Sequence, residues 1–431
     1  MRQSRMIAIA LSGLLLWGIH TIDGRAEDYS FDLSEVEKKP YEYAASLSVD
    51  PAVAWLNRDS LFYRLKYGDD GESVNDDYRA TLEASGSYAI SQTKIAAAGK
   101  YDVTYAEDEW ADDALLYELY LQSALNSNLT VWLGKKVIKW GRGYIWNPAA
   151  FVGRQKDVND VDATQEGYYL ATGEFVKSFD GRLRTFSLAP VIMPSGEDVN
   201  EDFSDVHSTN VALSAYLLFA DIDIGFYGFT DDHGQWKVGG DAARNLLTNW
   251  EIHAEWAYED ASEHLYLDQD YSLQRTSRNV TNILVGTRYL APSNTTVIAE
   301  YLHNGGGYSQ DEMNNFFEAA ELALDEGKRE LLPTVKSFQK DELSRQFLMQ
   351  DYLYLKLSQP EPFGILYFTP SAFVIYNLND NSLRLGCDVK YTRVTNLEFT
   401  LRQQYFSQEP FTEFGEKINT YKIDLTVEKY F

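Results

Sequence analysis

The sequence lacks the features that stabilise small secreted domains or that recruit nucleic acid. Its single cysteine, Cys387, excludes an internal disulfide. Only 38 Lys and Arg residues stand against 65 Asp and Glu, a formal net charge of −27, so a basic nucleic-acid surface is not expected. No stretch rich in Pro, Ser or Gly separates two domains. The histidines show no metal-ligand spacing and no glycine-rich phosphate loop is present, so we predict no metal and no cofactor.

The first 26 residues have the pattern of a secretory signal peptide. Arg2 and Arg5 are followed by an apolar run at 6–19 and by small residues that end at Ala26. The apolar run has 14 residues, whereas a membrane-spanning helix needs roughly 20. This length argues against an uncleaved anchor. Later in the chain no apolar run approaches that length, so we predict an exported protein that is cleaved near Ala26.

The informative pattern in the rest of the chain is alternation with a period of two. In NWEIHAEWAY (249–258), apolar Trp250, Ile252 and Trp256 alternate with polar residues. Runs 349–359 and 396–406 repeat the pattern, and each has about the ten residues that a tilted strand needs to cross a bilayer. A strand with one apolar and one polar face is typical of a barrel that contacts lipid outside and water or loops inside.

Connections between these runs predict the topology. Short turns and long polar loops alternate, as in a barrel with periplasmic turns and external loops. We therefore predict an all-β fold over 58–431, a single closed antiparallel transmembrane barrel of 18 strands that begins with a strand at 58–67. The stretch 231–247 is predicted as an external loop, and a weak strand at 263–271 restores the alternation. Sixteen strands is the alternative count, because the strand at 263–271 is inferred from the alternation of connections rather than from a strong pattern of its own.

Residues 27–57 are predicted as a periplasmic N-terminal segment, which either plugs the periplasmic mouth or contributes an extra strand. The C-terminal run YKIDLTVEKYF (421–431) alternates in the same way and ends on Phe431. It is expected to pair with the first strand, because an open strand edge in hydrocarbon would leave backbone groups unpaired.

The terminal aromatic residue resembles the C-terminal signature of bacterial outer-membrane barrels. Together with the signal peptide and the alternation, it makes the chain similar to the porin-like class. The resemblance implies insertion by the barrel assembly machinery through the C-terminal strand. It also implies location in the bacterial outer membrane, in contact with outer-membrane lipid and lipopolysaccharide.

The most distinctive loop is 139–165, which contains the turn WGRGYIWNP (140–148). Its aromatic residues are too apolar for a loop in free water, and basic and acidic residues stand close together. One hypothesis places the loop in the lumen as a constriction with a transverse field. The alternative packs it at the barrel rim with paired charges. The candidate residues are Trp140, Arg142, Trp146, Arg154, Lys156, Asp157, Asp160 and Asp162.

A second insert, about 309–346 within loop 304–345, changes to helical periodicity. Ser309 to Glu312 form a polar helix start, and Pro333 ends or restarts a helix. Such a helix needs an apolar surface to cover. It could cap the mouth as a lid or enter the lumen, or alternatively lie on the rim.

These patterns favour a porin-like channel that passes small hydrophilic solutes, with cation preference because carboxylates are in excess. The alternative is a sealed barrel that binds surface glycan or exports a polymer or lipid. An enzyme that uses a Ser-His pair is the third hypothesis and we do not favour it. A homo-oligomer is compatible with the sequence. Lumen-facing candidates are Glu251, His253, Glu255, Glu398, Arg402, Asp424 and Glu428.

Overall fold

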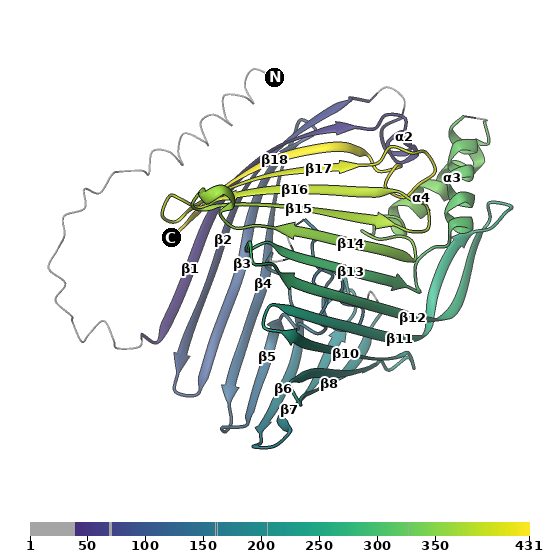
Figure 1. Cartoon of the computed structure of the whole chain (residues 1–431). Coiled ribbons are helices and arrows are strands. Elements are labelled where there is room, and N and C mark those ends of the chain that lie inside the picture. The colour runs from purple at the N-terminus through teal and green to yellow at the C-terminus, as the bar shows by residue number, and fades with distance from the viewer. Residues whose placement is uncertain (1–38, 69–70, 160, 162, 205, 326) are drawn as a thin grey trace.

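The computed structural model describes residues 39–431 except 69–70, 160, 162, 205 and 326, and the predicted signal peptide lies outside the described residues. One antiparallel sheet of 18 strands closes on itself as a barrel (Figure 1). The predicted fold class and strand count are therefore confirmed. Within the described residues, no helix has both the length and the apolar character needed to cross a membrane.

Neighbours in the barrel are neighbours in the chain. The first nine strands are β1 (Tyr41–Leu56), β2 (Val74–Ile90), β3 (Thr93–Ala106), β4 (Glu109–Ala124), β5 (Leu129–Lys136), β6 (Tyr168–Ser178), β7 (Leu183–Ser195), β8 (Ser208–Phe219) and β9 (Ile222–Thr230). The other nine are β10 (Trp236–Leu247), β11 (Trp250–Leu267), β12 (Leu273–Leu290), β13 (Thr296–Asn304), β14 (Asp351–Ser358), β15 (Phe368–Asn377), β16 (Leu383–Tyr391), β17 (Leu397–Phe406) and β18 (Asn419–Tyr430).

The C-terminal strand closes the barrel, as the alternation of its sequence predicted. β18 pairs with β1 in a register that runs from Ser46 opposite Tyr430 to Trp55 opposite Tyr421. The ladder ends where the Phe431 N–H donates to the carbonyl of Ala45 at 2.9 Å. Closure leaves no free strand edge, which is the condition for a sheet to stand in hydrocarbon.

Side chains alternate between the two faces as expected. On β11, Trp250, Ile252 and Trp256 are 39–45% exposed, whereas His253 and Glu255 are 2–3% exposed. The apolar residues therefore face outward and the polar ones face inward. Leucines on β4, β5, β8, β14, β16 and β18 add to the outward apolar belt: Leu119, Leu121, Leu133, Leu213, Leu353, Leu355, Leu357, Leu385 and Leu425.

The predicted first strand, 58–67, is wrong, because helix α2 occupies Leu61–Tyr67. The barrel instead begins with β1 at Tyr41, inside the segment 27–57 that was assigned to the periplasm. That segment thus contributes a strand, which takes the place of the one predicted at 58–67. Ser60 caps the helix by accepting from the Tyr63 N–H at 3.1 Å. Pro51 argued against a strand here, because proline has no backbone N–H to donate to the hydrogen bonds between paired strands.

Two further assignments near the middle of the chain are wrong. The expected external loop 231–247 contains β10, and only 231–235 connects β9 to it. The expected separate strand at 263–271 is largely the end of β11, a single 18-residue strand. One strand, β10, was missed and one strand was counted in excess, so the predicted total of 18 is unchanged. β10 lacks a clear apolar stripe on its outer face, which includes Gly240, Ala242 and Arg244. On its inner face, Gly239 lies so close to Phe151 and Ala149 that a Cβ would be 3.1–3.3 Å from them.

The two rims of the barrel differ. We call one the tight-turn rim; its connections are 91–92, 125–128, 179–182, 220–221, 248–249, 291–295, 359–367 and 392–396. The other, the loop rim, carries 137–167, α2, and the insert with α3 (Gln310–Leu324), the short 3-10 turn η2 (Arg329–Leu331) and α4 (Leu332–Asp341). Helices α2, α3 and α4 lie together at the end of the barrel opposite the C-terminus (Figure 1).

Candidate functional site

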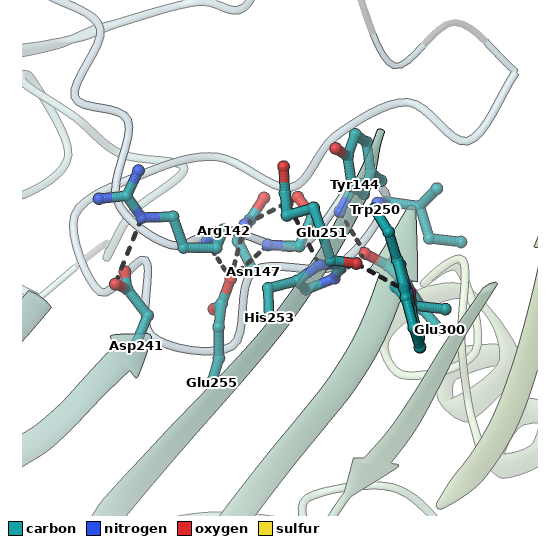
Figure 2. A network of polar contacts seen from close by, with 12 residues as sticks. Arg142, Tyr144, Asn147, Asp241, Trp250, Glu251, His253, Glu255 and Glu300 are labelled. Atoms are coloured by element: carbon teal, nitrogen blue, oxygen red, sulfur yellow. Dashed lines mark hydrogen bonds and ion pairs between the residues drawn. The ribbon is translucent and has the colours of Figure 1, made fainter. Parts of the chain in front are cut away.

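Loop 137–167 connects β5 to β6 and contacts the inner wall of the barrel. Its turn region lies over the inward-pointing side chains of β10, β11 and β13 (Figure 2). Farther along, Asn159 accepts a hydrogen bond from Arg384 on β16. The loop therefore reaches the wall formed by strands far from its own, which places it inside the lumen.

The carboxylate of Glu255 holds the first half of the turn. It accepts the backbone N–H groups of Arg142, of Gly143 at 2.6 Å and of Ala149 at 3.4 Å, and the side-chain amide of Asn147 at 3.0 Å. Glu255 is 2% exposed. A buried carboxylate is stable only when donors surround it, and here the backbone of the loop supplies them.

Glu300, on β13, holds the second half. Its oxygens accept the N–H groups of Tyr144 and of Ile145, the latter at 3.1 Å, and it lies 3.0 Å from His253 Nε2. The other ring nitrogen of His253 lies 3.6 Å from Glu251. Two strand carboxylates thus fix consecutive peptide groups of the loop, as Figure 2 shows.

Arg142 is held by acidic side chains of the wall. Its Nε lies 3.4 Å from Asp241 on β10, and its Nη2 lies 3.7 Å from Asp223 on β9. Burial disfavours the guanidinium charge, but the two carboxylates outweigh it and raise the pKa of Arg142. Trp140 stacks on Tyr227 with ring centroids 5.0 Å apart, and the Tyr227 hydroxyl donates to Asp241 at 2.5 Å.

The glycines of the turn are required by close approach. Gly141 has φ +91°, and a Cβ on it would lie 2.7–2.8 Å from the Glu255 oxygens. A Cβ on Gly143 would lie 1.9 Å from the carbonyl oxygen of Trp146. The WGRG sequence therefore permits the backbone to approach the carboxylate.

The two other basic candidates, Lys156 and Arg154, tie the loop to itself and to the β7–β8 connection. Lys156 donates to the carbonyls of Gly143, at 2.6 Å, and Tyr144, at 3.2 Å. Arg154 pairs with Glu166 at 3.0 Å and also with Asp202. These contacts orient the loop.

Only one of the three acidic candidates in the loop lies within the described residues. Asp157 is exposed and accepts the Asn159 N–H at 2.8 Å. Asp160 and Asp162 lie outside the described residues. Arg142 is therefore the basic candidate whose acidic partners, Asp223 and Asp241, come from the barrel wall.

Trp146 joins the loop to a buried apolar cluster. It is 6% exposed, and its ring lies 5.4 Å from Phe347, 6.2 Å from Tyr352 and 6.1 Å from Tyr354. The same cluster contains Phe316 of α3. The loop in the lumen and the helices at the loop rim thus share one apolar core.

We call α2, α3, α4 and the β17–β18 connection 407–418 the cap. Phe62 of α2 packs on Phe316 of α3 at 6.0 Å, and Phe317 of α3 stacks on Phe411 at 5.9 Å. The Leu61 N–H donates to Glu416 at 2.5 Å. The apolar faces of the insert therefore pack on other loops rather than only on the barrel wall.

Glu413 connects the cap to the inner wall. It accepts from the Tyr352 hydroxyl at 2.5 Å, the Asn377 amide at 2.8 Å and the Leu348 N–H at 3.0 Å. Burial raises the pKa of Glu413 to about 7, although Lys417 and the hydrogen bonds favour the carboxylate. Tyr352 touches both Glu413 and Trp146, and so links the cap to loop 137–167.

The start of α3 matches the predicted helix signal. Ser309 and Glu312 form a reciprocal capping box, and Pro333 lies in the first turn of α4, where it restarts the helix. His264, at the end of β11, lies 2.8 Å from Glu312. Burial disfavours the carboxylate, but the bonds from His264 and Ser309 outweigh it and lower the pKa of Glu312 to about 2.

This lowered pKa predicts how the cap responds to acid. The contribution of Glu312 is fully present above its ordinary pKa near 4.5 and is lost as the pH falls toward 2. We expect Glu312→Gln to weaken α3 by about 2–3 kcal/mol at pH 7 and by progressively less below pH 4.5. Hydrogen exchange of the α3 amides, corrected for intrinsic rates, measures this difference. Asp311→Asn, an exposed charge in the same helical turn, is the control.

The lumen-facing candidates fall into two groups. Glu251, His253 and Glu255 lie beside the loop, as described above. On the wall formed by the last strands, Arg402 lies 3.4 Å from Asp388 and 3.6 Å from Asp424.

The other two candidates are near neighbours on that same wall. Glu398 stands opposite Glu428 in the β17–β18 register. Glu398 pairs with Lys390 at 2.7 Å, and Glu428 accepts from the Tyr430 hydroxyl at 2.9 Å. Neither side chain hydrogen bonds to the described part of loop 137–167.

Sequence reasoning missed several residues that hold the loop. Asp241 lies in the stretch that was expected to be a loop, and Glu300 interrupts the apolar run TVIAEYLHN. A single carboxylate within an otherwise apolar strand is a usable signal, because it must find donors inside the fold. Arg384 and Glu413 carry no comparable sequence signal.

Comparison with known proteins identifies solved structures that share this fold. No protein-family model matches the chain, and no curated protein is similar to it in sequence. Acinetobacter baumannii OccAB1 is similar in structure, with TM-score 0.54 and 10% identity over 91% of this chain and 96% of that one. Pseudomonas aeruginosa OccK7 (OpdD) gives 0.52 and 9% over 91% and 98%, and OccK5 (OpdH) gives 0.51 and 9% over 90% and 98%. The chain thus has the fold of the porin-like outer-membrane β-barrels.

Proposed function

We propose that the protein is a channel of the bacterial outer membrane through which small hydrophilic solutes diffuse, with loop 137–167 as its constriction. The observation that carries this proposal is the anchoring of that loop inside a closed barrel by Glu255 and Glu300. An anchored loop narrows the lumen without depending on movement. The fold similarity supports the membrane location and, at 10% identity or less, contributes nothing on the solute.

The wall opposite the anchored loop supports a water-filled path. On β3, Lys100 pairs with Asp102 at 2.6 Å, and Asp102 also accepts from Thr81 at 2.6 Å. Tyr117 donates to Glu83 at 3.0 Å. These inward charged groups, with Arg402 and its partners, are characteristic of a hydrated lumen, since a dry core would not accommodate so many.

The external mouth of the barrel has a lid in this proposal. The cap joins the two loop-rim segments farthest apart in the chain, α2 and 407–418, through the Leu61–Glu416 bond. Solutes enter beside it or when it moves. Lipid and lipopolysaccharide cover the outward apolar belt, and the C-terminal strand is the part that the barrel assembly machinery engages.

Cation preference is the first testable consequence. Acidic groups outnumber basic ones by 65 to 38, and a negative lumen lowers the barrier for cations. In a planar bilayer with a salt gradient, we expect a reversal potential of the sign that a cation-selective pore gives. An anion-selective potential would contradict the preference and leave the channel itself intact.

A sealed barrel that binds surface glycan, or that exports a polymer or lipid, is the second candidate. The observation that favours it is the single apolar cluster shared by the cap and Trp146, which extends across the loop rim. Absence of conductance together with retained binding to cell-surface glycan would favour this candidate over the channel.

We do not propose an enzyme. His253, the histidine considered for a Ser-His pair, lies between Glu300 and Glu251, at 3.0 and 3.6 Å, rather than beside a serine. Labelling by a serine-reactive probe would contradict this view.

A further inference from the structure

The β14–β15 connection, residues 359–367, differs from every other connection at the tight-turn rim. It has nine residues, whereas the others have two to five. Phe363 is 97% exposed, and Ile365, Leu366 and Tyr367 are 49–61% exposed. From Pro362 to Tyr367 the sequence PFGILY carries no charge. A cluster of large apolar side chains is therefore presented outward at a site where the sequence could have placed a short polar turn.

This connection is ordered by its own hydrogen bonds. The Glu361 N–H donates to the carbonyl of Phe368 at 2.7 Å, and the Glu361 carboxylate accepts the Tyr367 N–H at 2.9 Å. The Thr392 N–H of the next turn donates to the carbonyl of Tyr367 at 3.1 Å. Pro362 is buried. The turn therefore has a fixed shape.

The fixed shape is also strained. Glu361, Phe363 and Tyr367 have φ values of 51°, 58° and 63°, in the left-handed region that residues with a side chain rarely occupy. Each such residue raises the free energy of the turn, and exposure of the Phe363 side chain to water recovers none of that cost. Strain together with exposure indicates that the apolar side chains are covered by something outside the chain.

The surroundings identify what covers them. Leu353, Leu355 and Leu357, 41–45% exposed, form the outward stripe of β14, which leads into this turn. Val394 on the adjoining turn is exposed as well. The apolar surface of the turn thus continues the belt that faces lipid, at the level where strands end and headgroups begin.

We infer that residues 362–367 form a wedge that inserts into the phospholipid leaflet at the tight-turn rim and fixes the depth of this wall of the barrel. The inference rests on the proposed membrane location. Aromatic and aliphatic side chains with no charge are suited to the boundary between headgroups and acyl chains. The backbone order of the turn means that insertion costs little further ordering.

The test uses single cysteines in a Cys387→Ser background. Phe363→Cys and, as a second position, Leu366→Cys carry an environment-sensitive fluorophore in phosphatidylethanolamine–phosphatidylglycerol vesicles. Quenching by nitroxide-labelled lipids is compared with quenching by aqueous iodide. Leu355→Cys is the lipid-facing control, and Ser127→Cys, on the polar turn 125–128, is the aqueous control.

We expect lipid quenching at 363 and 366 within about twofold of that at 355, and at least about fivefold above that at 127. Iodide quenching at 363 equal to that at 127, with 355 still quenched by lipid, would overturn the wedge alone. Shielding of 363 from both quenchers that grows with protein density would also overturn it, in favour of contact with a second copy. Lack of lipid quenching at 355 would instead overturn the membrane location.

Discussion

Replacing Glu255 and Glu300 together by leucine is expected to release loop 137–167 from the inner wall and to raise single-channel conductance severalfold. The two carboxylates accept five N–H groups of the loop, those of residues 142, 143, 144, 145 and 149. Leucine accepts none. Each buried N–H left without a partner costs about 1–3 kcal/mol, so the docked loop loses its main support.

The released N–H groups find other acceptors only in water. Asn147 loses Glu255 and keeps the Gly143 carbonyl. Arg142 keeps Asp241 and Asp223. Those remaining contacts are long, at 3.4 and 3.7 Å. They do not compensate for the lost backbone bonds, since ion pairs of this geometry contribute little near water.

Two measurements test this result independently. Conductance in a planar bilayer reports the width of the path, and limited trypsin digestion reports whether the loop is docked, through cleavage after Arg154 or Lys156. The matched control is Glu398→Leu with Glu428→Leu, which removes the same charge from the wall that does not contact the loop. If both double variants resist trypsin as the unmodified protein does, the two carboxylates do not anchor the loop.

The trypsin result stands even if the protein is not a channel. A sealed barrel would show loop cleavage in the Glu255/Glu300 variant without conductance. That combination would retain the anchoring described here and reject the proposed function.

The barrel could be predicted because lipid and lumen impose a period of two on the chain. Trp250, Ile252 and Trp256 on one face of β11 had no other simple explanation once the chain was seen to repeat the pattern. Closure of the barrel was predicted from a general requirement rather than from a particular residue, because a free strand edge is not stable in hydrocarbon. These constraints apply to every strand, so the prediction of a closed barrel remains correct even when single strands are assigned wrongly.

The error at β10 occurred where a loop packs on the inner wall. Phe151 and Ala149 of loop 137–167 pack on Gly239. The inner face of β10 therefore mixes small Gly239 and Ala243 with charged Lys237 and Asp241, and it shows no clear pattern. The pattern of such a strand depends on the loop that fills the lumen, which a local reading of the sequence cannot supply.

Of the candidate site, only the loop could be predicted from the sequence, and its partners on the barrel wall could not. The WGRG turn and its flanking aromatic residues identify a loop that must avoid water, but its partners on the wall lie up to 225 residues away in the chain. Glu300 had a signal as a lone carboxylate in an apolar strand, whereas Arg384 meets Asn159 only through the closed barrel. Long-range pairing of this kind depends on the barrel geometry and leaves no local trace.

Substitution of Gly143 by alanine is expected to have the second large effect, by preventing the turn from forming. A Cβ at this position would lie 1.9 Å from the carbonyl oxygen of Trp146 and 3.0 Å from a methyl group of Leu284. The first contact is with backbone, so no change of rotamer relieves it. Overpacking of a buried site costs typically about 1–3 kcal/mol, and a backbone overlap this close belongs above that range.

The shift that relieves the overlap also breaks the anchor. The Gly143 N–H donates to Glu255 at 2.6 Å, and its carbonyl accepts from Lys156 at 2.6 Å. Moving the backbone of Gly143 separates its N–H from Glu255 and its carbonyl from Lys156 at once. We therefore expect Gly143→Ala to resemble the double carboxylate variant, with faster trypsin cleavage of the loop and higher conductance, although it removes no charge.

The control is Gly228→Ala on β9, where an added Cβ meets no atom within 4 Å. It should leave the trypsin half-life and the conductance unchanged. Heat-dependent gel migration reports whether each variant forms a barrel, so that failure to fold is distinguished from a displaced loop. A folded Gly143→Ala protein with unmodified trypsin resistance would show that the loop tolerates a side chain there, and the tight approach of the turn to Glu255 would then be disproved.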